Sequence, residues 1–209
     1  MFNQYSMFSK DNLEAVMSQI MSETIVNKDY EDEYKLRIAL TNSTLSPNSS
    51  YHIHALDRFN AGDMFIWEGN YYLVTGDTVL KRHSKYKSTA EYCNARLEYW
   101  LLEKVEVGRD DLDRPIYEDR WGLKANEAGV MRKETNISID ENQAINLTDY
   151  RMEIKIRDTI KNRETYETNQ SIRINSRWFK VADTILMKNG LIHVSVKTSS
   201  RPTGFPNDL

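Results

Sequence analysis

Residues 63–80, DMFIWEGNYYLVTGDTVL, are the most informative part of the chain, because residues 170–186, QSIRINSRWFKVADTIL, repeat their pattern. With one residue of slack at Gly76, the matched positions are Phe65 and Ile172, Trp67 and Ile174, Tyr71 and Trp178, Tyr72 and Phe179, Val74 and Val181, Asp77 and Asp183, and Thr78 and Thr184. In both copies an alternating apolar strand leads through a polar turn into an aromatic-rich return strand, which is typical of a β-hairpin. We therefore predict a mainly β protein with two hairpin-based units, each a small barrel or sandwich.

The composition sets the outer limits of this prediction. A chain of 209 residues can form one sizeable core or two small ones. Hydrophobic residues make up 40% and charged residues 28%, which is typical of a globular protein. The net charge of −3 argues against a general nucleic-acid binder, because such proteins need a dominant positive field. No apolar run approaches the ~20 residues that span a bilayer, so no membrane partner is expected.

The N-terminal region predicts an amphipathic helix over residues 10–25, with apolar residues at helical spacing. Ser9 is placed to cap its free amide groups, and Asp11 and Glu14 suit its positive end. The helix is expected to pack on its own domain, and docking on a neighbouring subunit is the alternative.

Further strands are predicted from apolar alternation at residues 34–40, 51–56, 152–156 and 191–196. Residues 89–102 fit a strand or a helix, and the strand is favoured because the preceding return strand needs a partner. Residues 105–122 predict a strand, a turn around 110–115 and a short return strand. Residues 124–134 have no usable period, and short strands are expected at 136–142 and 144–147.

The resulting division has five parts: an N-terminal arm and helix (1–29), a first β unit (30–104), an irregular or extended middle segment (105–150), a second β unit (151–198) and a C-terminal arm (199–209). The middle segment is long for a connection in a compact domain, which suggests that it is functional or fits another subunit. The C-terminal arm is expected to be disordered or ordered by a partner.

The search for catalytic, cofactor or metal sites nominates no residue. His52 and His54 lie two apart on a predicted strand with Asp57 nearby, but spacing suggests no third ligand. Residues 110–113, DDLD, resemble part of a calcium loop but lack its glycine and its bidentate glutamate, so an acidic turn is favoured. Whether either place binds an ion stays open.

Cys93 is the only cysteine, which excludes an intrachain disulfide and a thiolate zinc cage and fits a reducing compartment. A lone cysteine in an aromatic strand is usually a core residue. The basic run Lys81, Arg82, His83, Lys85 and Lys87, with Tyr86 among them, suits nucleic-acid contact or a solvated sheet edge. The negative net charge favours the solvated edge.

Several short phrases resemble those of small structural proteins from tailed bacteriophages that infect Gram-positive bacteria. The resemblance covers about residues 62–198, and its phrases are 66–74 (IWEGNYYLV), 93–100 (CNARLEYW), 173–175 (RIN), 178–181 (WFKV) and 189–192 (NGLI). The chain departs from the pattern in an extra residue before Trp100, in the N-terminal helix and in the tail after Thr198.

The resemblance implies a head-to-tail connector of the adaptor, stopper or head-closure kind. Such a protein forms a homo-oligomeric ring in the virion after assembly in the host cytoplasm, and joins the portal protein to tail or neck proteins. DNA passes through its channel without sequence-specific binding, and no catalytic residue or cofactor is expected. The alternatives are a tail or baseplate protein, a small-barrel nucleic-acid-binding module, and an enzyme that uses Cys93 or the His52/His54 pair.

Overall fold

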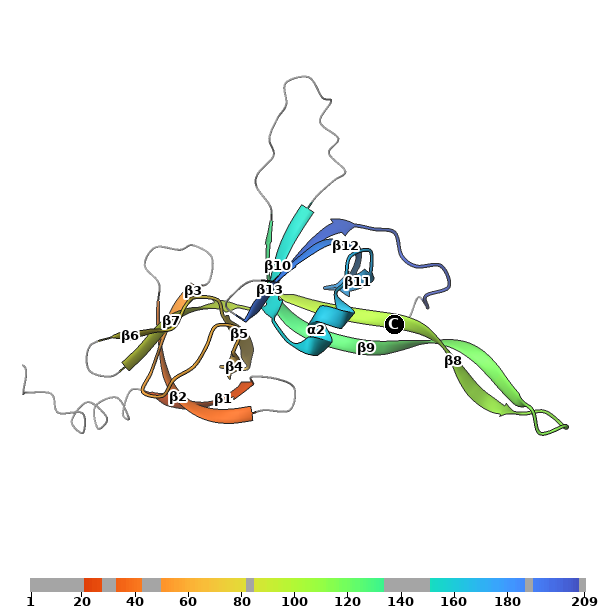
Figure 1. Cartoon of the computed structure of the whole chain (residues 1–209), viewed down its shortest axis with the longest axis horizontal. Helices are drawn as coiled ribbons and strands as arrows, with labels where there is room; N and C mark the ends of the chain where they lie inside the picture. The colour runs from red at the N-terminus through yellow and green to blue at the C-terminus, as the bar shows by residue number, and fades with distance from the viewer. Residues whose placement is uncertain are drawn as a thin grey trace, which may run out of the picture.

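In the computed structural model, which describes residues 21–27, 33–42, 50–81, 85–133, 151–186 and 190–206, the chain is mainly β and forms two sheets (Figure 1). The first sheet, called the first unit below, has the strand order β3-β2-β1-β4-β5-β7-β6. A further pairing of β3 with β7 rolls this sheet onto itself. Its strands are β1 (Ser22–Asn27), β2 (Glu33–Asn42), β3 (Ser50–Ala55), β4 (Met64–Trp67), β5 (Asn70–Val74), β6 (Val79–Lys81) and β7 (Lys85–Tyr92).

The second sheet is a closed barrel in the order β10-β13-β12-β11-β8-β9, with β9 pairing with β10 to close it. Its strands are β8 (Ala95–Arg109), β9 (Pro115–Lys133), β10 (Arg151–Arg157), β11 (Ser171–Ile174), β12 (Arg177–Leu186) and β13 (Leu191–Thr198). A short helix, α2 (Ile160–Thr165), connects β10 to β11. The predicted mainly β class is thus confirmed, and the second sheet is a barrel.

The repeated phrase forms the same hairpin in each sheet. Trp67 pairs with Asn70 around Glu68 and Gly69, and Ile174 pairs with Arg177 around Asn175 and Ser176. All four turn residues have positive φ (48° and 77°, then 45° and 70°), as a two-residue type I′ turn requires. The matched pairs Phe65–Tyr72 and Ile172–Phe179 lie directly opposite each other.

Each sheet buries its own apolar cluster, and the matched aromatic positions divide between core and edge. Tyr72 and Phe179 are buried in the two cores. Trp67 and Trp178 are half-buried, and Tyr71 is 44% exposed. A third cluster joins the sheets; its buried members are Met64, Leu73, Val130 and Leu191.

The strand boundaries correct several expectations. Residues 22–25, which the sequence places in the N-terminal helix, belong to β1 and pair with β2, whereas residues 1–20 lie outside the described residues. Residues 89–102 do not form a single strand. They belong to β7 and β8, which meet at a corner formed by Cys93 and Asn94. Because β8 begins at Ala95, the barrel starts before the predicted boundary at 104.

The middle segment differs most from its prediction. Strand β9 runs through residues 124–133, where no period is visible, because the barrel-facing positions are Ala125, Glu127 and Gly129 rather than large apolar residues. The two short strands expected at 136–142 and 144–147 lie outside the described residues.

The C-terminal segment packs on its own chain as far as residue 206. Phe205 is 6% exposed and makes edge-on contacts with Trp100, Trp121 and Trp178, at ring-centroid distances of 5.4, 5.2 and 4.8 Å. The Trp121 indole Nε1 donates to the Gly204 carbonyl oxygen at 3.0 Å. This part of the predicted arm therefore covers the base of the β8–β9 hairpin. No helix among the described residues has the length and apolar character needed to cross a membrane.

Candidate functional site

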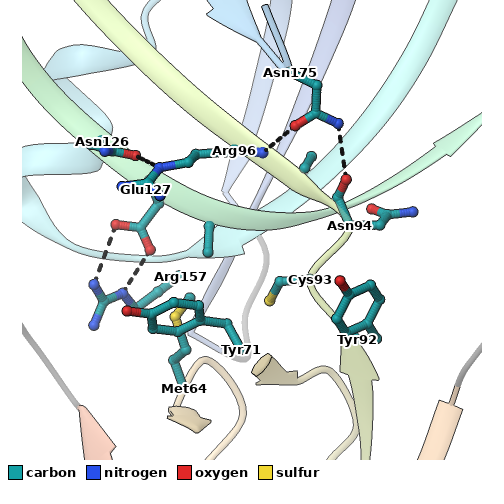
Figure 2. A pocket seen from close by; sticks show the side chains of 12 residues that line it. Met64, Tyr71, Tyr92, Cys93, Asn94, Arg96, Asn126, Glu127, Arg157 and Asn175 are labelled. Atoms are coloured by element: carbon teal, nitrogen blue, oxygen red, sulfur yellow. Dashed lines mark hydrogen bonds and ion pairs between the residues drawn. The ribbon is translucent and has the colours of Figure 1, made fainter. Parts of the chain in front are cut away.

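A pocket of about 480 Å³ lies where the two sheets meet (Figure 2). The first unit contributes Met64 from β4, Tyr71 from β5 and Tyr92 from β7. The barrel and the corner before it contribute Cys93, Asn94, Ala95, Arg96, Asn126, Glu127, Ala128, Arg157 and Asn175. The pocket is therefore a property of the joint between the units, and no single sheet forms it.

The pocket is lined by a buried ion pair, Arg157–Glu127. The Arg157 Nε donates to Glu127 Oε1 at 2.8 Å, and its Nη2 donates to Oε2 at 3.3 Å. Both residues are buried, with 5% and 1% exposed. A bidentate contact of this kind suits the planar guanidinium group and holds β9 against β10. Glu127 is thus committed to an ion pair and is not a free general base.

Two asparagines close the corner between the sheets. Asn94 donates to the Met131 carbonyl oxygen at 3.0 Å and accepts from the Met131 amide at 2.7 Å. Asn175, in the turn of the second hairpin, accepts from the Arg96 amide and donates to the Asn94 carbonyl oxygen, both at 3.0 Å. The asparagines of the phrases CNARLEYW and RIN therefore meet in space, which gives the spacing of those phrases a structural reason.

Glu91 at the end of β7 also ties the first unit to the barrel. Its carboxylate accepts from the Thr75 hydroxyl at 2.7 Å, contacts Arg132 of β9, and lies 3.6 Å from Lys155 Nζ of β10. Burial by itself raises the pKa of Glu91, but the Thr75 hydrogen bond and the two cations outweigh it and lower the pKa below its usual value. The group is therefore a charged anchor between the units.

Cys93 lines the pocket without being activated. Burial, assisted by the nearby Glu127 carboxylate, raises its pKa from 9.0 to about 12. No histidine is among the residues that line the pocket. A thiol of this kind behaves as a structural residue.

We expect Cys93 in the folded protein to react with iodoacetamide at pH 8 roughly a thousandfold more slowly than a free cysteine, since a pKa of about 12 instead of 9.0 lowers the thiolate fraction by that factor. Stopped alkylation followed by intact-mass measurement checks this. The same chain in urea serves as the control and should react at the ordinary rate; fast labelling of the folded chain would mean that the thiol is activated.

The two histidines of β3 lie on the outer face of the first unit, away from the pocket residues. His54 pairs with Lys87 of β7, which in turn pairs with Val79 of β6, so one row of side chains crosses three strands. Lys81 and Lys85 form the next row. We call His52, His54, Lys81, Lys85 and Lys87 the basic face. The two histidines are distant from the three lysines in the sequence, and the pairing of β3 with β7 brings the two groups together.

The basic face does not suit a metal cation. Burial lowers the pKa of His54, and the charges of Lys85, Lys87 and His52 lower it further. No group of three or more His, Cys, Asp or Glu side chains in the described part of the chain is placed to hold a metal ion. His54 Nε2 is instead 3.2 Å from the Thr41 hydroxyl. The lysines make this a surface that attracts anions.

Residues 110–113 form the tip of the β8–β9 hairpin. Asp110 Oδ1 accepts from the Leu112 and Arg114 amides, both at 2.9 Å, and its Oδ2 accepts from Arg114 Nε at 2.8 Å. The backbone hydrogen bond from Arg114, the largest cause, lowers the pKa of Asp110. This carboxylate is used in closing the turn, as an acidic turn requires.

The hairpin continues past the barrel as a two-stranded ribbon (Figure 1). Strand β8 pairs with β11 only at Leu97 and Glu98, and β9 pairs with β10 only at residues 130–133. Beyond the tryptophans that Phe205 covers, the described strands pair only with each other, and we call residues 103–120 the arm. Its exposed apolar side chains are Val105, Val107, Leu112, Ile116 and Tyr117.

Comparisons with known proteins identify no family. No family model matches the chain, and no curated protein matches it. A structure of K. pneumonia MrkH in its apo state aligns over 93% of this chain and 88% of its own, at 8% identity and a TM-score of 0.21. A second structure, described as MrkH, a c-di-GMP-dependent transcription regulatory factor, covers 93% and 85% with the same identity and TM-score. A likeness at this level supports neither a shared fold nor a shared function.

Proposed function

We propose that the protein is a virion structural protein that forms a homo-oligomeric ring at the portal–tail junction of a tailed bacteriophage. In this role it joins head to tail, helps to retain the packaged DNA, and lets DNA pass without gripping it. The resemblance of residues 62–198 to connector proteins motivates the proposal.

The observation that carries the assembly role is the arm. A two-stranded ribbon is marginally stable by itself in water, and the arm exposes apolar side chains that include Leu112 at 72%. Exposed apolar side chains on an element that projects from its sheet fit an interaction site. We infer that the arm reaches across a neighbouring subunit and makes the contact that closes the ring.

The pocket supports an assembly role over a catalytic one. Its carboxylate, Glu127, is paired with Arg157, and its thiol, Cys93, has a raised pKa. His52 and His54, the histidines that the enzyme alternative names, lie on the outer face of the first unit. The structure therefore keeps them apart from Cys93.

Negative-stain microscopy and sedimentation of the purified full chain, alone and with its portal protein, test the proposal. We expect closed rings with a central opening, and we expect the chain among the proteins of purified virions by mass spectrometry. A chain that stays monomeric with portal and tail components and is missing from virions would rule the proposal out.

A nucleic-acid-binding module is the second candidate, favoured by the basic face. Lys81, Lys85 and Lys87 lie close together on two paired strands. A shift of labelled duplex DNA that weakens steeply with added salt would support this candidate. Absence of any shift at 50 mM salt would exclude it.

A further inference from the structure

We propose that the arm of one copy docks on the basic face of the next copy. The inference rests on the homo-oligomeric ring proposed above and names the two surfaces that build it. It follows from three properties of the described residues: complementary charge, matching apolar side chains, and the positions of the two surfaces on the molecule.

The first property is charge. The arm holds seven acidic and four basic side chains, a formal net charge of −3, which equals that of the whole chain. The positive charge of the basic face comes from its three lysines, because burial and the neighbouring charges lower the pKa of His54. Opposite fields of this kind steer two surfaces together and fix their register.

The second property is exposed apolar surface on both partners. On the arm, Val105 is 39% exposed and pairs with Glu118, so an apolar and an acidic side chain share one face. On the first unit, Val79 is 46% exposed and pairs with Lys87, so an apolar and a basic side chain share one face. Docking would bury both apolar side chains and would bring the acidic and the basic side chains face to face.

The third property is position. In Figure 1 the tip of the β8–β9 hairpin and strands β3, β6 and β7 lie at opposite ends of the long axis. The arm therefore cannot reach the basic face of its own chain. A contact between different patches of successive copies is heterologous, and such contacts build a ring when the rotation closes and a filament when it does not.

Mixed cross-linking tests the pairing in the full chain. In a Cys93→Ala background, one preparation carries Glu118→Cys on the arm and another carries Lys87→Cys on the basic face. A short bis-maleimide should link the mixture into a covalent pair, whereas neither preparation should link by itself. Thr168→Cys, at another exposed position, replaces Glu118→Cys in the matched control and should give no link.

Charge reversal gives an independent readout. Glu118→Lys with Asp119→Lys should weaken self-association about tenfold in sedimentation experiments, because like charges would then face each other. Lys85→Glu with Lys87→Glu should weaken it similarly, and mixing the two variants should restore it. Unchanged thermal unfolding of each variant excludes loss of folding as the cause.

The outcomes separate this inference from the proposed function. Rings that form without an arm–face cross-link and without sensitivity to charge reversal would overturn the docking contact and leave the ring intact. An arm–face cross-link in a chain that never joins portal or tail proteins would support the contact and contradict the virion role. Duplex DNA binding that is lost in Lys85→Glu with Lys87→Glu, together with absence of the cross-link, would assign the basic face to nucleic acid.

Discussion

Replacing Glu127 with alanine is expected to lower the free energy of unfolding by about 3–5 kcal/mol, because it leaves the Arg157 guanidinium buried without its carboxylate. Arg157 is only 5% exposed, so few water molecules contact its guanidinium group in the folded chain. Urea unfolding followed by tryptophan fluorescence measures the change. Since the pair lies beside the joint between the sheets, we expect the barrel and the joint to loosen together.

The controls for this prediction distinguish the cost of leaving a buried charge unpaired from the cost of losing an ion pair as such. Glu118→Ala removes a carboxylate that lies 3.0 Å from Arg120 with both side chains more than half exposed, and it should change stability by less than about 0.5 kcal/mol. Glu127→Leu with Arg157→Met should recover most of the loss, since a buried pair is often replaceable by apolar residues. If the free energy of unfolding of the Glu127→Ala variant lies within about 1 kcal/mol of that of the natural chain, Arg157 does not depend on this carboxylate.

Gly62→Ala is expected to destabilise the fold by about 3 kcal/mol, the sum of roughly 1–2 for a left-handed backbone and 1–3 for overpacking. Gly62 has φ +88°, and a Cβ there would lie 2.1 Å from the Gly190 carbonyl oxygen. That oxygen also accepts from the Asp158 amide at 2.9 Å, so it cannot move without breaking a second contact. Thermal unfolding of the variant measures the effect.

Gly69→Ala is the matched control, because Gly69 has a similar φ of +77° and nothing within 4 Å of its Cβ position. This variant should lose only about 1–2 kcal/mol of stability, which is the cost of a left-handed backbone at a residue that has a Cβ. Equal losses for the two variants would show that the close approach of Gly62 to Gly190 contributes nothing to the joint between the units.

Local sequence pattern predicts the two hairpins because everything that forms them is local. Gly69 and Asn175 tolerate positive φ, and the flanking strands alternate with a period of two. The same reasoning fails for β9, whose barrel-facing side carries Ala125, Glu127 and Gly129. It also misses α2, where Thr159 caps a helix too short to show a period.

The candidate surfaces could not be read from the sequence for a related reason. The basic run 81–87 and the pair His52/His54 are visible as separate motifs, but nothing local says that His54 lies opposite Lys87. In the same way, Glu91 comes from β7 and its partners Arg132 and Lys155 from β9 and β10. Contacts between residues this far apart depend on which strands become neighbours.

By itself, the sequence determined the mainly β class, the repeated hairpin and the acidic turn at residues 110–113, because propensity and turn chemistry act over a few residues. Only the tertiary structure decided that the return strand from Pro115 is long, that the hairpin extends past the barrel as an arm, and that Phe205 covers its base. The physical reason is that strand pairing and burial join residues distant in the chain, and solvent exposure on both sides of the arm removes the alternation that would have revealed it.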